Sequence, residues 1–348
     1  EEGYVRYDAV WEEIPRISVP YGFSSNLFDV YGTYDIGRMV GLEVGYKYNK
    51  ISRTFRETEH TTENTFRAAA DLRFEGGFLV RALYELGKRD FDHYDAIEGE
   101  HASFLGAGPP ANQTVLRRYD QAKRDRNRFG GQFQWTPASG MVSLGASYFW
   151  NKDDYDDSPV PCVIDREFCP GGEQLPLGLQ EAEYKTFSLD VDVSPSDMYT
   201  FYGFYSREDF SDVQTGRQSG GTLVFDPASN WRSNVDDKVN SLGAGANFML
   251  VPDRWFLDIF YRYQKVDGNN ALEAGTNLRP DGAEDIPDFD DTTINFFSAQ
   301  VRYKFAEFWS IGLGGFYEDY KIVDSQTGQV LNYMPGSFFI NANNGDFG

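Results

Sequence analysis

Few side chains in this sequence have the type and spacing that enzyme chemistry requires. The three histidines, His60, His93 and His101, fall in stretches expected to be loops, without a Ser or Cys nearby at a usable spacing. A nucleophile needs a base within hydrogen-bond reach, and no such pair stands out along the chain. We therefore expect a protein that is not an enzyme.

Two groups of carboxylates contain the oxygen ligands that Ca²⁺ prefers. They are Asp153, Asp154, Asp156 and Asp157, and then Glu284, Asp285, Asp288, Asp290 and Asp291. Neither group has the fixed spacing of a known calcium loop, and solvated acidic loops are the more common source of such clusters. Calcium binding in these loops stays open as an alternative to simple solvation.

The two cysteines, Cys162 and Cys169, lie close together in a segment rich in Pro, Gly and Asp. Their spacing predicts a disulfide that closes a small loop in an oxidising compartment. A metal site would need two more ligands, and His101 is far away in sequence. No Cys-x-x-Cys-His motif occurs, so the chain cannot attach c-type haem to itself.

The composition favours β structure. The 348 residues include 22 Tyr, 29 Phe and 35 Gly, and the net charge is −22. Aromatic residues prefer strands, and the acidic balance argues against binding to nucleic acid or to an anionic membrane surface. No uninterrupted run of 18 apolar residues exists, so no transmembrane helix is expected. A membrane barrel needs apolar residues only at every second strand position.

The clearest pattern lies between Tyr184 and Tyr205. From Phe187 to Val193 the odd positions are apolar, whereas the even positions are polar and include Asp190 and Asp192. Turn residues follow at 194–197, and a second alternating run comes after them. The pattern predicts a β-hairpin with one apolar face. If the pattern recurs along the chain, lipid is the best explanation of that face.

The pattern recurs in six pairs of expected strands. They cover residues 28–36 and 40–48, 66–74 and 78–86, 129–135 and 142–150, 187–193 and 199–205, 242–250 and 255–263, and 297–305 and 309–317. Short turns fall near residues 37, 76, 138, 196, 253 and 307, whereas the connections 50–64, 90–128, 151–183, 209–237 and 265–292 are long. This arrangement is typical of a transmembrane up-and-down antiparallel β-barrel with short periplasmic turns and long extracellular loops.

Aromatic residues on the apolar face provide a second test of the barrel. Those beside the short turns include Phe74, Phe78, Trp135, Tyr199, Trp255, Phe305 and Trp309, and those near the long loops include Tyr46, Tyr48, Tyr84, Trp150, Tyr261, Tyr263 and Tyr317. Two such belts mark the two interfaces of a membrane. We therefore expect residues 1–348 to form a single outer-membrane barrel, with at least twelve strands in residues 26–320.

The opposite face of these strands should line the lumen. Its charged residues carry both signs, and they are Glu43, Lys47, Arg67, Asp71, Arg73, Arg81, Glu85, Asp190, Asp192, Asp258, Arg262, Arg302 and Lys304. Ordinary ion pairing in a lumen is the better explanation for any one of them. Glycines on this face, such as Gly243 and Gly245, would leave room for water or for a second protein, or would relieve strain in a curved sheet.

Four sets of motifs are spread over roughly residues 25–325. They are Arg53-Thr54 with Thr62-Glu63-Asn64, Arg118-Tyr119-Asp120 with Arg124-Asp125-Arg126, Ser194-Pro195-Ser196 with Tyr202-Gly203-Phe204-Tyr205-Ser206, and Asn230-Trp231 through Asp236-Asp237 to Gly243-Ala244-Gly245. In their order and spacing they resemble the MtrB/PioB family, outer-membrane barrels that are associated with decahaem cytochromes.

The resemblance implies a sheath in the outer membrane of a Gram-negative cell. A periplasmic multihaem c-type cytochrome would insert into its lumen, and electrons would cross through the haem c groups of that partner, with a second cytochrome outside in some members. Family members are longer and have more strands, and the chain lacks a terminal aromatic strand, so we expect it to be part of a larger barrel. The alternative is a diffusion porin or a substrate-specific channel with a water-filled lumen and a loop folded into the pore.

Overall fold

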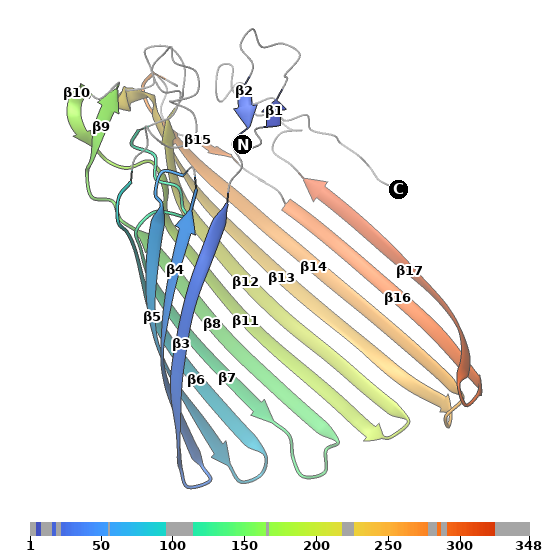
Figure 1. The fold of residues 1–348 in the computed structure, drawn as a ribbon. Helices are drawn as coiled ribbons and strands as arrows, with labels where there is room; N and C mark the ends of the chain where they lie inside the picture. Colours follow the sequence, from blue (N-terminus) through green and yellow to red (C-terminus); the bar gives the residue numbers. More distant parts are fainter. Residues whose placement is uncertain are drawn as a thin grey trace.

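Twelve strands form one antiparallel sheet in which each strand pairs with its neighbours in sequence (Figure 1). The structure is a computed structural model that describes residues 5–7, 16–18, 22–54, 56–94, 114–164, 167–217, 226–277, 284–286 and 291–323. The strands are β3 (Phe23–Ile36), β4 (Val40–Arg53), β5 (His60–Phe74), β6 (Phe78–Phe91), β7 (Arg124–Trp135), β8 (Val142–Tyr155), β11 (Gly178–Ser196), β12 (Tyr199–Arg217), β13 (Asn230–Val251), β14 (Trp255–Ala274), β16 (Asp291–Ala306) and β17 (Trp309–Val323). The all-β, up-and-down antiparallel architecture predicted from the sequence is confirmed.

Short elements complete the described fold. β1 (Val5–Tyr7) pairs with β2 (Arg16–Ser18), β9 (Val160–Ile164) pairs with β10 (Glu167–Gln174), and β15 (Glu284–Ile286) joins the large sheet beside β14. A 3-10 turn, Pro227–Ser229, precedes β13. Within the described residues, no helix is long and apolar enough to cross a membrane.

The short turns lie at one end of the sheet and the longer connections at the other (Figure 1). All six short turns fall where the sequence predicts them, between consecutive strands of each hairpin. Gly76 and Gly77 have φ angles of 89° and 84° in the turn between β5 and β6. Only glycine adopts such angles without a steric cost, which explains how two long strands reverse direction over three residues.

The two faces of the sheet differ in chemistry. We call the face that carries Glu43 and Arg67 the polar face, and the opposite one, which carries Val44 and Phe66, the apolar face. Val44 is 64% and Phe66 60% exposed, whereas the side chains of Glu43 and Arg67 are each 25% exposed. The polar side chains are thus partly buried against one another, whereas the apolar side chains are exposed. This is the reverse of a water-soluble sheet, and it is expected where lipid covers the apolar face.

Several strands are longer than the sequence pattern indicates, and the expected loop boundaries were wrong there. Pairing between β12 and β13 continues to Arg217 and Asn230, so most of the expected loop 209–237 is strand. β14 likewise continues to Ala274. The extensions are rich in Asp, Asn, Ser and Thr on both faces, so they show no hydrophobic period, although their backbones still pair.

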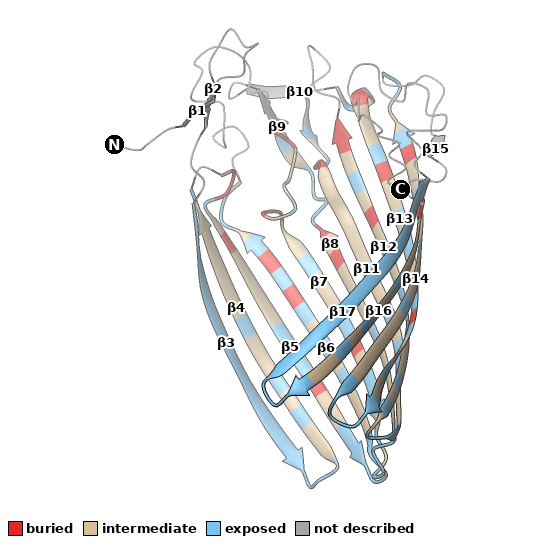
Figure 2. Ribbon diagram, turned by 90° about the vertical axis from the view of Figure 1, so that its right-hand side faces the viewer, coloured by how far each residue is buried: buried red, intermediate tan, exposed pale blue. Residues whose placement is uncertain are grey.

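The sheet has two free edges among the described residues. β3 pairs only with β4 and β17 pairs only with β16. Figure 2 shows β17 crossing in front of the sheet while β3 lies on the far left. All residues of β3 are exposed, in keeping with its place at an edge.

The largest fully buried side chains belong to residues near the long connections, such as Gln121, Val115 and Thr58, and Figure 2 shows further buried residues along several strands. Val115, Cys162 and Leu177 form a small apolar cluster, and Gln121 and Thr58, which are joined by a hydrogen bond, are also buried. Among the described residues no second layer packs on the sheet, so its faces carry little buried apolar surface there. Function must therefore be sought on the polar face and at the loop end.

Candidate functional site

Charged residues on the polar face of β3 to β6 form a continuous ion-pair network. Each of its three arginines lies between two carboxylates, and the N···O distances are 3.6 and 3.2 Å from Arg67 to Asp29 and Glu43, 3.6 and 3.7 Å from Arg73 to Asp35 and Asp71, and 3.7 and 3.5 Å from Arg81 to Glu43 and Asp71. Glu85 also pairs with Arg128 at 3.3 Å. The sequence predicted these residues for one face, and the register of four strands brings them into contact.

Glycines in β4 allow the arginines to lie flat. A Cβ at Gly45 would be 2.7 Å from Arg67 Nε, and one at Gly41 would be 3.1 Å from Asp35 Oδ1. Both distances are closer than ordinary van der Waals contact. The glycines of this face therefore make room for neighbouring side chains of the same chain.

Five aromatic rings form a second feature, which we call the aromatic row, on the polar face of β12 to β17. Successive centroids are 6.2 Å apart from Tyr202 to Phe260, 6.4 Å from Phe204 to Phe260, 6.2 Å from Phe260 to Phe296, and 6.1 Å from Phe296 to Phe316. These distances are within the range of favourable ring pairs. A hollow of about 400 Å³ lies along the row, with Asp258 and Gln300 also among its lining residues.

Strand register produces this row. Tyr202 is directly opposite Gly245, which is opposite Phe260, and Phe260 is opposite Ser298, which is opposite Phe316. Large and small residues thus alternate across five strands. A Cβ on Gly245 would overlap the Tyr202 ring, and one on Gly243 would overlap the Phe204 ring. The space that the sequence assigned to water or to a second protein is filled there by rings of this chain.

The remaining charged residues expected on this face lie there without an ion pair to another described residue. They are Lys47, Asp190, Asp192, Asp258, Arg262, Arg302 and Lys304. Arg262 lies over the Phe296 ring at 5.7 Å, and Arg302 lies over Phe256 at 4.6 Å. A guanidinium at these distances from a ring face makes a cation–π contact. Asp190 instead covers Gly145, where a Cβ would overlap its carboxylate.

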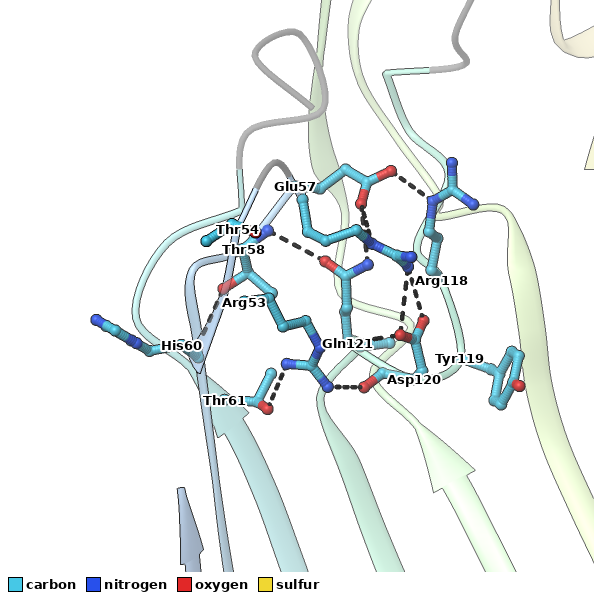
Figure 3. Close-up of polar contacts among 12 residues, drawn as sticks. Arg53, Thr54, Glu57, Thr58, His60, Thr61, Arg118, Tyr119, Asp120 and Gln121 are labelled. Atoms are coloured by element: carbon cyan, nitrogen blue, oxygen red, sulfur yellow. Dashed lines mark hydrogen bonds and ion pairs between the residues drawn. The ribbon is translucent and has the colours of Figure 1, made fainter. Parts of the chain in front are cut away.

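The loop end holds a third feature, the loop-end network (Figure 3). Gln121 accepts a hydrogen bond from the Thr58 backbone N–H at 3.1 Å and donates to Glu57 at 2.9 Å. Glu57 also pairs with Arg118. Gln121 is 0% and Glu57 6% exposed, so both polar groups need the partners they have.

Two strand arginines, Arg53 and Arg89, and the loop residue Arg56 extend this network. Arg53 donates to the Asp120 carbonyl at 2.9 Å, Arg56 reaches the Asp120 carboxylate at 3.2 Å, and Arg89 donates to the Ala122 carbonyl at 2.8 Å. Because Arg53 and Arg89 share the strand parity of Glu43 and Arg81, they lie on the polar face. The segment 114–123 is therefore tied to the polar face at the loop end of the sheet.

Burial and hydrogen bonding act in opposite directions on Glu57. Burial alone would raise its pKa, but hydrogen bonds from its own backbone, Gln121 and Arg118 outweigh this effect and hold the pKa below the ordinary value. Nearby, burial raises the pKa of Tyr94 to about 12, and Arg117 lies 4.2 Å from the Tyr94 ring centroid. Glu57 therefore stays ionised and Tyr94 neutral at physiological pH.

Sequence reasoning did not identify the loop-end network as a site. It noted Arg53, Thr62, Glu63, Arg118, Asp120 and Arg124 only as motif residues, in stretches expected to be loops. The structure joins two of those motif sets, because Arg124 pairs with Glu63 at 2.6 Å and Arg56 with Asp120. The sequence feature that could have indicated this site is the recurrence of arginines next to acidic residues in two distant segments.

The described residues bear on the predicted disulfide and on the possible calcium sites in different ways. Cys162 is buried and disulfide-bonded, while the side chain of Cys169 lies outside the described residues. Both Asp153 carboxylate oxygens are bonded to Arg126 at 2.7 Å. No group of three or more His, Cys, Asp or Glu that could hold a metal occurs in the described part of the chain, and residues 287–290 of the second acidic cluster fall outside it.

Known proteins similar to this chain are outer-membrane proteins. A family model described as "Putative outer membrane beta-barrel porin, MtrB/PioB" matches residues 3–347. "Outer membrane protein MtrB" of Shewanella baltica (strain OS185) is 24% identical over 262 residues, which cover 74% of this chain and 33% of that protein. The chain thus spans one third of the length of this relative.

The matching solved structures have low sequence identity and low TM-scores. The siderophore receptor PiuA of Acinetobacter baumannii is 10% identical, with a TM-score of 0.43 over 87% of this chain and 59% of the receptor. The ferric-catecholate import receptor Fiu of E. coli K12 is 10% identical, with a TM-score of 0.34 over 84% and 62% of the two chains. By the match to the family model over nearly its whole length, this chain belongs to the MtrB/PioB family of outer-membrane β-barrel porins.

Proposed function

We propose that this chain forms the wall of an outer-membrane sheath that houses a multihaem c-type cytochrome and so supports electron transfer across the membrane. Membership of the MtrB/PioB family supports the outer-membrane location and the porin-like barrel. The apolar face would contact lipid, and the polar face would line the lumen. The short turns would be periplasmic and the loop-end network would face outward, as is usual for barrels of this type.

The observation that carries the proposal is the flatness of the polar face. Arg67 lies across Gly45, Asp190 across Gly145, Phe204 across Gly243 and Tyr202 across Gly245. Side chains that fold down onto glycines leave a smooth wall, and close packing of two proteins requires complementary, smooth surfaces. No catalytic step is assigned to this chain, and haem would be carried by the partner.

A channel with a water-filled lumen is the second candidate, and one observation favours it. The segment 114–123 is tied to the polar face through Arg53, Arg56 and Arg89. A loop held against the inner wall is how a porin narrows its opening. In the sheath, the same segment would form an ordered collar around the partner at the outer end.

The sheath and the channel differ in whether a haem protein is purified together with the barrel. The test is the absorption spectrum of the full-length protein extracted gently from outer membranes, followed by conductance in a planar bilayer. The sheath predicts a haem Soret band in a fixed ratio to the barrel, and low conductance. A barrel without a Soret band that conducts ions freely would overturn the sheath and support the channel.

A further inference from the structure

The two halves of the polar face differ in how far their charged side chains are already paired within this chain. In β3 to β6, each arginine of the ion-pair network already contacts two carboxylates of the same chain. Charges that are paired within the wall gain little from a second protein, which would first have to displace those partners. Of the charged residues that the sequence places on this half, only Lys47 has no ion pair to another described residue.

In the half formed by β12 to β17, charged side chains lack ion-pair partners among the described residues. The aromatic row lies on the polar face, where Tyr202, Phe204, Phe260 and Phe296 are partly exposed, and Phe316 on the edge strand β17 is 76% exposed, as are its neighbours in that strand. Contiguous exposed apolar surface bordered by polar groups is characteristic of protein interaction sites. Tyr202 and Phe204 lie directly over Gly245 and Gly243, and ring contacts continue from them through Phe260 and Phe296 to Phe316, so the five rings form a continuous platform.

Cations border this platform. Arg262, Arg302 and Lys304 share its face, and none forms an ion pair with another described residue. Two carboxylates of the same face, Asp258 and Glu318, do not pair with them, so the local balance is three cations to two anions.

We propose that the aromatic row, with Arg262 and Arg302, is the docking surface for an apolar patch of the lumen partner that is edged by carboxylates. The inference rests on the proposed function, and the occupant is the cytochrome housed there. Apolar groups would cover the rings, and the carboxylates would pair with the guanidinium groups of Arg262 and Arg302, which have no ion-pair partner among the described residues. The partner would thus be seated against β12 to β17, off the axis of the lumen, with a hydrated gap along the ion-pair network.

The test compares exposed aromatic residues at the two edges of the sheet. The variant Phe296→Gln/Phe316→Gln removes two rings of the row, and Tyr31→Gln is the matched control. Tyr31 is also an aromatic residue of the polar face on an edge strand, and it is 63% exposed. Both variants are made in the full-length protein. Folding is checked by the heat-modifiable electrophoretic mobility of the barrel, and the haem-to-barrel ratio is measured after gentle extraction.

We expect the double variant to bind the cytochrome at least about tenfold more weakly, because two buried apolar side chains are lost from the contact. The control should keep the wild-type ratio. A second variant, Arg262→Gln/Arg302→Gln, should make binding less sensitive to salt. The Arg262→Gln/Arg302→Gln variant also tests the docking surface if Phe296→Gln/Phe316→Gln does not fold.

Each contrary result has its own meaning. A wild-type barrel without any haem protein would overturn the proposed function and this docking surface with it. A wild-type Soret band that stays unchanged in both multiple variants would overturn the docking surface and leave the sheath standing. Equal loss of haem in Tyr31→Gln would show that the contact is not confined to β12 to β17. A change of oligomeric state at an unchanged haem ratio would assign the row to contacts between copies, which also overturns the proposal.

Discussion

At the scale of single residues, Glu57 holds two distant loop segments together. Its carboxylate accepts hydrogen bonds from Arg118 and Gln121. We expect Glu57→Gln to speed amide hydrogen exchange in residues 114–123 at least about tenfold, because hydrogen bonds to charged groups contribute roughly 1.5–3 kcal/mol. Glu59→Gln is the control, since the Glu59 side chain is 85% exposed. Equal exchange in both variants would show that Glu57 does not hold the segment.

The loop-end network should also depend on pH. The pKa of Glu57 in the folded protein lies below its ordinary value of 4.5. Its stabilising contribution is therefore fully present above pH 4.5 and is lost as the pH falls through the folded pKa. Protease nicking within residues 114–123 should rise in that acid range for the wild type. The variant Glu57→Gln should show no such dependence, and a parallel rise in both proteins would contradict this assignment.

Gly245 on the polar face of β13 and Gly131 on the apolar face of β7 differ in how much they tolerate a methyl group. A Cβ at Gly245 would overlap the Tyr202 ring and lie 2.8 Å from the Ile259 carbonyl oxygen, whereas nothing lies within 4 Å of one at Gly131. We expect Gly245→Ala to lower the free energy of unfolding by about 1–3 kcal/mol, as for overpacking elsewhere. Gly131→Ala should be neutral or stabilising. Urea-induced unfolding in detergent or lipid measures both, and equal stabilities would contradict the role given to Gly245.

At the scale of elements, the ion-pair network stabilises the pairing of the edge strand β3 with the rest of the sheet. Arg67 and Arg73 reach Asp29 and Asp35 of β3, whereas Arg81 contacts only residues of β4 and β5. We expect Arg67→Gln/Arg73→Gln to speed amide exchange in β3 up to about fivefold for each pair, because partly exposed pairs contribute roughly 0–1 kcal/mol. Arg81→Gln should leave β3 unchanged. Faster exchange of β3 in the control would mean that the network acts as one unit.

Strand ends show where sequence patterns stop being informative. Alternation ends near Tyr205, yet β12 continues to Arg217 because its backbone still pairs with β13. Beyond the apolar span both faces carry polar residues, so no alternation marks the strand. The hydrogen bonds that extend it come from a neighbour, which a sequence pattern does not reveal.

At the scale of the whole molecule, the two faces should respond differently to charge. Leu189 lies on the apolar face of β11 and Asp192 on the polar face three residues further on. We expect Leu189→Arg to destabilise the membrane-inserted barrel by about 2–4 kcal/mol, the cost of an arginine facing the bilayer midplane. Asp192→Arg should have little effect. Assembly in liposomes measures this difference, and equal assembly of both variants would show that lipid does not cover the apolar face.

The sequence by itself determined the strands, their order, the short turns and the separation into two faces. These follow from a period of two and from turn residues, which are local properties of the chain. The resemblance carried by scattered motifs also indicated the family that the comparison confirms. Even so, the sequence placed Arg67, Asp71 and Gly245 on one face without saying what each would touch.

The tertiary structure decided those contacts. Strand register selected the partners of the ion-pair network, laid Tyr202 and Phe204 across Gly245 and Gly243, and tied residues 114–123 to the polar face. Register depends on hydrogen bonds between strands that lie tens of residues apart. A shift of two residues would keep every side chain on its face and change all of its neighbours, which is why alternation predicts the face of a residue and not its partner.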